Sequence, residues 1–211
     1  MKISYVELEH EIFSNCYLIV NEKTGEGAVV DPAWYGDALK KAIGDIRIKY
    51  ILLTHGHFDH IFGVYGLREA TGAKVVIHEN DAGHLLDPKK SLAEGNFPET
   101  QIPVEADMFV KDGDVLTLGD EEIKVMHTPG HTMGSVCYIC ENERVIISGD
   151  TLFCMTAGRT DFFDGSDELM VESLKRLIGL EGNYEVYPGH NRMTDLDSER
   201  KRNWYIRKMV R

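Results

Sequence analysis

A cluster of four polar side chains directly follows a short apolar run at residues 50–53, and its members are His55, His57, Asp59 and His60. The run is continuously apolar and brief, which favours a strand buried in a sheet. Side chains that follow a buried strand project from the edge of the sheet, where a rigid scaffold positions binding and catalytic residues. We therefore expect a sheet that carries a polar site at its edge.

The types and spacing of these four side chains suit two neighbouring metal ions. Residues two apart in an extended segment face the same way, which lets His55 and His57 bind one ion. Asp59 and His60, turned by the start of the following helix, would bind a second ion at the separation of about 3.5–4 Å that is usual for two-metal sites. The density of ligand-type side chains argues against a polar loop with unrelated histidines.

Three further residues are candidates to complete the site, because two imidazoles do not close a metal centre. They are His131, Asp150 and His190. Each follows an expected strand and lies beside Gly or Pro, which is typical of a loop. Singly, each would be interpreted as a turn residue, but together with the first cluster they form a consistent set of ligands.

Hydrophobic periodicity predicts strands and helices in two β-rich halves. The expected strands are residues 2–8, 16–21, 27–30, 50–53, 73–78, 115–118, 122–127, 135–140, 144–148 and 184–187. The expected helices are 35–43, 61–71, 167–178 and one from about Asp195. Periodicity alone supports an α+β protein with a sheet core, and the two halves suggest a four-layer αββα sandwich. Residues 85–105 form an irregular stretch that is either a flap facing a substrate or a surface excursion.

The composition argues against nucleic acid and membrane partners. The formal net charge is −12, whereas a grip on phosphate backbones needs clustered Lys and Arg. Glu7, Glu9 and Glu11 interrupt the region where a signal peptide would be apolar, and no run is long enough to span a membrane. We therefore expect a cytoplasmic protein without a membrane anchor.

The chain has four cysteines, which fits a reducing compartment better than a disulfide framework. Cys137 and Cys140 match the spacing C-x-x-C, but they lie in an apolar run that predicts a strand. Positions three apart on a strand point to opposite faces. We therefore expect two buried core thiols and not a redox pair.

The order and flanks of the ligand candidates resemble the metallo-β-lactamase superfamily, with H-x-H-x-D-H after a strand and then a distant His, Asp and His. More closely, residues 54–60, 128–134, 149–153 and 188–190 resemble hydroxyacylglutathione hydrolase, or glyoxalase II, and the resemblance spans residues 15–203. It implies one metallo-β-lactamase domain over residues 1–211. A short C-terminal helix would stand in place of a full helical domain, as in the short bacterial members.

The resemblance also implies a role for each ligand candidate. His55, His57 and His131 would hold the first ion, and Asp59, His60 and His190 the second, with Asp150 bridging both. Zinc is the expected metal, with iron and manganese as alternatives. A water bound to both ions would ionise and attack as hydroxide, and Asp59 would orient it.

Two further residues have two interpretations each. Arg159 lies in a segment that resembles the Cys-Gly-Arg-Thr-Asp of short glyoxalase II proteins, with Ala157 in place of the Cys. It would bind a substrate carboxylate or pair with Asp161 as internal bracing. Asp31 would support the first metal site from behind or only end a strand in a turn. The remaining histidines, His10, His78, His84 and His127, are interpreted as structural or surface residues.

The function that the resemblance implies is hydrolysis of a small-molecule acyl thioester such as S-D-lactoylglutathione. The main alternative is a mononuclear iron persulfide dioxygenase that uses two histidines with Asp150. A lactonase or phosphodiesterase on the same metal core is a third interpretation, and a protein that only binds a partner is a fourth. The oligomeric state has no signal in the sequence.

Overall fold

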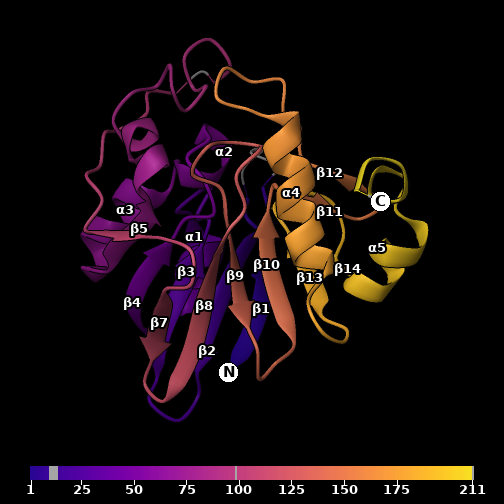
Figure 1. Cartoon of the computed structure of the whole chain (residues 1–211). Helices are drawn as coiled ribbons and strands as arrows, with labels where there is room; N and C mark the ends of the chain where they lie inside the picture. Colours follow the sequence, from indigo (N-terminus) through magenta and orange to yellow (C-terminus); the bar gives the residue numbers. More distant parts are fainter. Residues whose placement is uncertain (10–13, 98, 211) are drawn as a thin grey trace.

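The computed structural model describes residues 1–9, 14–97 and 99–210, and in this part of the chain two six-stranded sheets form the centre of the molecule (Figure 1). The first sheet has the order β1-β2-β3-β4-β5-β6, with bounds Lys2–Val6, Cys16–Asn21, Glu26–Val30, Arg47–Leu52, Lys74–His78 and Met108–Val110. The second has the order β14-β13-β10-β9-β8-β7, with bounds Thr194–Asp195, Glu185–Pro188, Val145–Gly149, Val136–Cys140, Glu121–His127 and Val115–Leu118. Each half of the chain thus builds one sheet.

Strand direction changes inside both sheets. Strands β1 to β3 pair antiparallel, as the hairpin pattern predicts, whereas β3 to β6 pair parallel. In the second sheet β7 to β10 form an antiparallel series, and β13 then pairs parallel to β10. Parallel neighbours need crossover connections, which place the ends of several strands at the same edge.

Alternation along the strands divides the apolar side chains among three cores. Leu18 faces the core under α1 (Asp37–Ile43) and α3 (Val64–Thr71), while its neighbour Ile19 faces the other sheet. Tyr138 likewise belongs to the core between the sheets, and Ile139 to the core under α4 (Asp167–Ile178). Both sheets are therefore covered on both faces, and the predicted α+β, four-layer αββα sandwich is confirmed.

The predicted helix over residues 61–71 is wrong in one respect, because two helices occupy this region. They are α2 (Phe58–Ile61) and α3, which begins after Gly63 and ends at the left-handed Gly72. The amide of Gly63 donates a hydrogen bond to the carbonyl oxygen of Pro32, 2.8 Å away, and a Cβ at Gly63 would lie 2.5 Å from that oxygen. Packing against a distant loop therefore divides the helix, and local periodicity carries no sign of it.

The other helices agree closely with the prediction. Helix α4 has the predicted bounds, and the side chain of Ser166 caps its N-terminus by accepting a hydrogen bond from the amide of Leu169. Helix α5 (Leu196–Arg202) begins after Asp195, and η2 (Ile206–Val210) follows it. None of the described helices has the length and apolar character needed to cross a membrane. The organisation as one domain over residues 1–211 stays a prediction.

The side chain of Arg200 in α5 contacts the end of α4 and the loop that follows it. Its guanidinium donates hydrogen bonds to the carbonyl oxygens of Ile178, Leu180 and Gly182, at 2.8, 2.5 and 2.7 Å. The last carbonyls of a helix lack partners within the helix. Arg200 therefore satisfies the last carbonyl of α4 and two carbonyls of the following loop, and it ties α5 to both.

The prediction for the C-x-x-C pair is confirmed. Cys137 and Cys140 are buried on opposite faces of β9, the first in the core under α4 and the second in the core between the sheets. Burial raises the pKa of Cys137 to about 11 and that of Cys140 to about 12, so both are inert thiols near neutral pH.

Replacing both thiols by serine is expected to leave activity unchanged under reducing conditions. Stability should fall by about 1–3 kcal/mol at Cys140, where the change buries a hydroxyl in an apolar core, and by less at Cys137, whose Sγ lies 3.6 Å from the carbonyl oxygen of Ser148. Turnover and denaturant unfolding of the Cys137→Ser/Cys140→Ser protein measure the two effects. Activity that responds to redox conditions in the wild type and loses this response in the double variant would contradict a purely structural role.

Candidate metal centre

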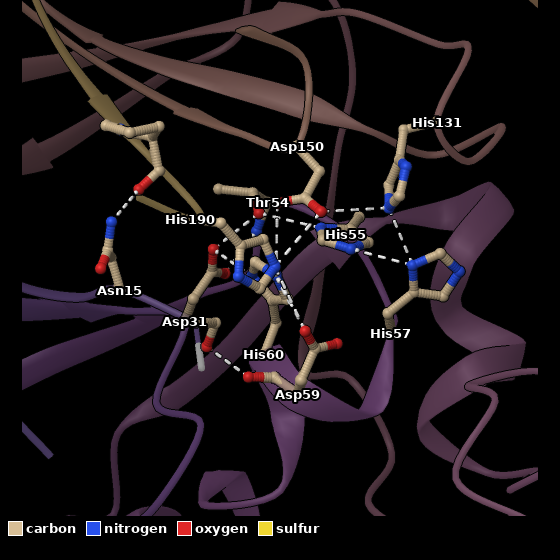
Figure 2. A network of polar contacts seen from close by, with 12 residues as sticks. Asn15, Asp31, Thr54, His55, His57, Asp59, His60, His131, Asp150 and His190 are labelled. Atoms are coloured by element: carbon tan, nitrogen blue, oxygen red, sulfur yellow. Dashed lines mark hydrogen bonds and ion pairs between the residues drawn. The ribbon is translucent and has the colours of Figure 1, made fainter. Parts of the chain in front are cut away.

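The seven predicted ligands meet at one edge of the sandwich, although they come from four separate segments (Figure 2). His55 and its neighbours follow β4. Asp150 and His190 follow β10 and β13, which are parallel and therefore end at the same edge. His131 lies between β8 and β9, and a backbone hydrogen bond joins the start of β9 to the loop after β4. The fold thus brings together residues that are up to 135 positions apart, from 55 to 190.

His55, His57 and His131 form one group of converging ring nitrogens. Nδ1 of His57 lies 2.9 Å from Nε2 of His131 and 3.2 Å from Nε2 of His55. The three rings are nearly perpendicular to one another, with interplanar angles between 82° and 87°. All three side chains are buried. Imidazole nitrogens that converge on one point are the ligands that zinc and iron prefer.

Asp59, His60 and His190 form the second group, and Asp150 lies between the two. Nε2 of His190 is 3.2 Å from Oδ2 of Asp59, and Nε2 of His60 is 3.9 Å from the same oxygen. Oδ2 of Asp150 lies 3.4 Å from Nε2 of His131 in the first group and 3.4 Å from Nε2 of His190 in the second. This is the place that a bridging carboxylate requires.

His55, His57 and Asp150 have the protonation states that metal ions need. Burial, together with the neighbouring rings of His60 and His131, lowers the pKa of His55 well below its usual value. Burial beside His131 lowers the pKa of His57 to about 3. Burial alone would raise the pKa of Asp150, but the facing His60, His190 and His131 together hold it well below its usual value. Neutral imidazoles and an ionised carboxylate bind a cation directly.

Unsatisfied polar atoms show that the donor set fits cations. Among the described residues, Oδ1 of Asp150 is buried and accepts no hydrogen bond. An unsatisfied buried polar group costs about 1–3 kcal/mol, and more when it is charged. A dication in each group would satisfy this oxygen and the converging imidazole lone pairs. The residues present therefore fit two ions, one in each group of three, with Asp150 shared.

Asp31 contacts His60, a ligand candidate of the second ion, whereas the sequence had associated Asp31 with the first metal site or with a simple turn. Its Oδ2 lies 2.9 Å from Nδ1 of His60 and accepts a hydrogen bond of 2.6 Å from Oγ1 of Thr54. Its Oδ1 accepts the amide of Thr54 at 2.8 Å. Asp31 is buried and has a φ of +49°, a conformation that is strained for a residue other than glycine. The contact leaves Nε2 of His60 free to face Asp150 and His190.

Close backbone approach fixes His131 and Asp150. Nδ1 of His131 donates a hydrogen bond to the carbonyl oxygen of Arg159, 2.7 Å away, which leaves Nε2 as the ligand atom. The same loop passes so near that a Cβ at Gly158 would lie 1.8 Å from the carbonyl oxygen of Asp150. A Cβ at Gly189 would lie 2.2 Å from Oδ1 of Asp150. Positions 158 and 189 must therefore be glycine, because any side chain there would clash with Asp150.

A cavity of about 690 Å³ opens onto the ligand cluster. Beside the ligands, its wall has apolar side chains, namely Phe58, Leu92, Phe153 and Phe162. Leu92 and Asn96 come from residues 85–105, so this stretch faces the site as the flap interpretation predicts, while Pro98 lies outside the described residues. The cavity can hold a small molecule with an apolar portion against the aromatic wall.

Arg159 lines this cavity but is already paired. Its Nε and Nη2 each lie 2.9 Å from a carboxylate oxygen of Asp161, and the guanidinium lies 4.8 Å from the centre of the Phe162 ring. Both charged side chains are exposed. The structure therefore shows the bracing interpretation of Arg159, and a role in substrate binding is a matter for proposal.

The buried carboxylate of Asp81 makes contacts near the site that were not predicted. Asp81, in η1 (Glu79–Leu85), accepts hydrogen bonds from the amides of Gly56 and Gly134 and from Oγ1 of Thr132, at 2.9, 2.7 and 2.7 Å. It thereby ties the loop of His57 to the loop of His131. Asp81 lies 25 residues from Gly56 and 53 from Gly134 in the sequence, so no local pattern pointed to these contacts.

His84, which was interpreted as structural or surface, is buried beside His57, 3.2 Å from Asp164. His78 and His127 stack on each other with ring centres 4.1 Å apart, which agrees with a structural role. His10 lies outside the described residues. Four histidines were not assigned to the site from the sequence. Among the three of them that the structure describes, only His84 lies at the site.

Comparison with known proteins agrees with this geometry. Residues 11–190 match the family model of the metallo-beta-lactamase superfamily. The chain is 31% identical to a hydroxyacylglutathione hydrolase of Pelagibacter ubique, over 90% of this chain and 71% of that protein. Its fold is similar to that of the BLEG-1 B3 metallo-beta-lactamase, with a TM-score of 0.90, 30% identity and coverage of 97% and 99% of the two chains.

A second solved structure with a similar fold is that of TTHA1623 in a di-iron-bound form. The TM-score is 0.82 and the identity 28%, and the match covers 96% of this chain and 100% of the other. The family model covers most of the residues that build the two sheets and all seven ligand candidates. The chain therefore belongs to the metallo-β-lactamase superfamily, whose members are typically metal-dependent hydrolases.

Proposed function

We propose that this protein is a dinuclear metal-dependent hydrolase of small acyl thioesters, of the glyoxalase II type. The observation that carries the proposal is the pair of three-residue ligand groups that share Asp150 at the base of one cavity. The similarity to a hydroxyacylglutathione hydrolase supports the substrate class. Two divalent ions held there would supply a water that ionises near neutral pH and would polarise the carbonyl under attack.

Asp59 has the position of a group that directs the attacking water. Its carboxylate lines the cavity and remains about a quarter exposed, unlike the buried Asp150. Burial opposes ionisation of Asp59, but the adjacent His60 and His190 together outweigh it and lower the pKa. The Ser14 hydroxyl donates a hydrogen bond to the backbone carbonyl of Asp59 and so fixes the residue. An ionised, fixed carboxylate at the cavity floor can accept a hydrogen bond from water and set its direction.

Hydrolysis of a thioester at this site does not require a proton donor for the leaving group, whereas hydrolysis of an oxygen ester does. A thiol has a pKa of about 8.5, so a thiolate leaves near neutral pH without a proton donor, whereas an alkoxide needs one. The apolar wall of Phe58, Phe153 and Phe162 suits an acyl chain or the thioether portion.

The thiol carrier is proposed to be held loosely. Glutathione carries two carboxylates, and Arg159 is the one Lys or Arg among the described residues that line the cavity. Its charge is already matched by Asp161, so a carboxylate would have to compete for it. Few contacts are therefore available to immobilise the carrier and raise affinity.

Turnover of S-D-lactoylglutathione is expected with a high KM, and other thiol carriers should be tolerated. S-lactoyl-N-acetylcysteamine lacks the glutathione carboxylates and should keep kcat/KM within about tenfold, a difference of about 1.4 kcal/mol. The measurement compares both thioesters with an isosteric oxygen ester, a homoserine lactone, a β-lactam and glutathione persulfide. All are run on the same preparations, loaded with zinc or with iron.

Each arm of this panel decides between interpretations. Faster turnover of the persulfide by the iron-loaded protein than of any thioester would replace the proposal by the dioxygenase, with His55, His57 or His131 and Asp150 as ligands. A preference for the lactone or the β-lactam would keep the metal centre and reject the thioester. If protein loaded with metal in both ligand groups hydrolyses none of these compounds, the interpretation as a protein that only binds a partner would replace the hydrolase.

The proposal also names a metal, a cellular location and a binding partner. Zinc is the proposed metal, with iron and manganese as alternatives, because histidine and carboxylate ligands accept all three. The proposed location is the cytoplasm, supported by four free cysteines, three of them buried. The proposed partner is the small-molecule substrate, without nucleic acid or membrane. The charge of −12 supports this choice.

A further inference from the structure

His57 has one ring nitrogen that the ligand cluster does not use. Its Nδ1 faces Nε2 of His55 and Nε2 of His131, so Nδ1 is the nitrogen aimed at the metal position. The two nitrogens of an imidazole point in different directions, and Nε2 of His57 is buried and has no hydrogen-bond partner in the described structure. When Nδ1 binds a metal ion, Nε2 carries the proton, and a buried N–H needs an acceptor.

Asp164 offers that acceptor, and His84 forms an ion pair with it. Oδ2 of Asp164 lies 3.2 Å from Nε2 of His84, which makes no hydrogen bond at this distance, while Oδ1 of Asp164 is buried and has no hydrogen-bond partner. A possible ligand atom comes from each of His57, His84 and Asp164, and these three atoms lie within 4.8 Å of one another. The described structure therefore holds an unpaired buried donor and an unpaired buried acceptor side by side.

His84 is itself fixed in place on several sides. Its Nδ1 lies 3.2 Å from the carbonyl oxygen of Asp81, and its ring stacks on Phe163 with centres 6.0 Å apart. A Cβ at Gly56 would lie 2.4 Å from Cβ of His84, so the backbone beside His57 packs directly on this residue. Asp81 also binds the loop of His57, and the pair thus rests on the same frame as the ligand loops.

We propose that Asp164, held by His84, is a positioning residue that accepts a hydrogen bond from Nε2–H of His57 and fixes this ring as a ligand of the first metal ion. The bond sets the tautomer of His57 and increases the basicity of Nδ1. The proposal rests on the proposed role of His57 in the metal centre and does not depend on the thioester substrate.

The experiment measures zinc affinity and the state of the His57 ring. Zinc affinity is determined by competition with a chelator for the wild type, Asp164→Ala and Asp161→Ala. Asp161 is a matched control because it is an exposed carboxylate of the same loop that pairs with Arg159. Loss of an acceptor behind a ligand typically weakens metal binding about 10–100-fold, so we expect this loss for the ion bound by His57 in Asp164→Ala and no loss in Asp161→Ala.

The second readout is the Nε2–H resonance of His57 in zinc-loaded protein with isotope-labelled histidine, assigned by its absence in His57→Gln. We expect this resonance to move upfield in Asp164→Ala, because the hydrogen bond is gone, and to stay in place in Asp161→Ala. Asp164→Asn keeps the shape and an acceptor oxygen without the charge, and it should move the resonance part of the way. This variant replaces Asp164→Ala if thermal unfolding shows that the latter folds poorly.

An unchanged His57 resonance overturns the proposal even if zinc affinity falls, because the loss would then not act through His57. Zinc affinity within about threefold of the wild type also overturns it, since that lies below the usual effect of removing such an acceptor. Neither readout uses substrate turnover, so failure of the thioesterase proposal leaves this test intact.

Discussion

Asp150→Asn is expected to lose metal and activity together. The amide is neutral and cannot offset the repulsion between two dications. The change should reduce metal content towards one ion or fewer per chain and lower kcat by at least about a hundredfold, the upper end of what loss of a supporting contact costs. Metal analysis of the purified variant and its kcat at saturating zinc measure both effects.

Asp120→Asn is the matched control for this change. Asp120 is an exposed carboxylate that pairs with Lys23 at the surface hairpin, so its loss should leave metal content and kcat unchanged. Asp150→Asn should also keep the overall fold, because the side chain is isosteric. Full metal content with wild-type turnover in Asp150→Asn would remove Asp150 from the metal centre.

Asp59→Ala is expected to reduce kcat by at least about a hundredfold, or about 2.7 kcal/mol of transition-state stabilisation. Asp59 is proposed both to hold the second ion with His60 and His190 and to direct the attacking water, and both roles act on the chemical step. Because the substrate does not need this carboxylate for binding, KM should change little. Steady-state kinetics of the variant saturated with metal separate the two parameters. A rise in KM at unchanged kcat would contradict the role of Asp59 in directing water.

Much of the fold was predictable because its longer elements have clear local patterns. Helix α4 combines a Ser cap, apolar residues at helical spacing and a glycine at its end. Its predicted bounds are therefore the same as the observed ones. The cysteines of β9 were placed on opposite faces by alternation alone. The elements that were missed are short. β6 (Met108–Val110), β11 (Leu152–Phe153), β12 (Thr156–Ala157) and β14 form only by pairing with neighbours that no local pattern reveals.

The site was predictable to the extent that its side chains lie next to strand ends. The H-x-H-x-D-H cluster and three loop residues with glycine or proline neighbours gave the candidates, and resemblance gave their grouping. Asp31 had two open interpretations, because only the fold shows that His60 lies within 2.9 Å of it. Asp81 and the pair of His84 and Asp164 had no signal, since their contacts join segments 25 to 80 residues apart in the sequence. Such support residues are set by packing between layers and not by spacing along the chain.

The most direct test of the account is the metal content of the purified protein, measured together with hydrolysis of S-D-lactoylglutathione after the metal is removed and restored. The account predicts about two divalent ions per chain, loss of hydrolysis on removal, and recovery only as the second ion binds, because both ligand groups are needed. One iron per chain, with full activity at that loading, would contradict the dinuclear centre that joins all seven ligands.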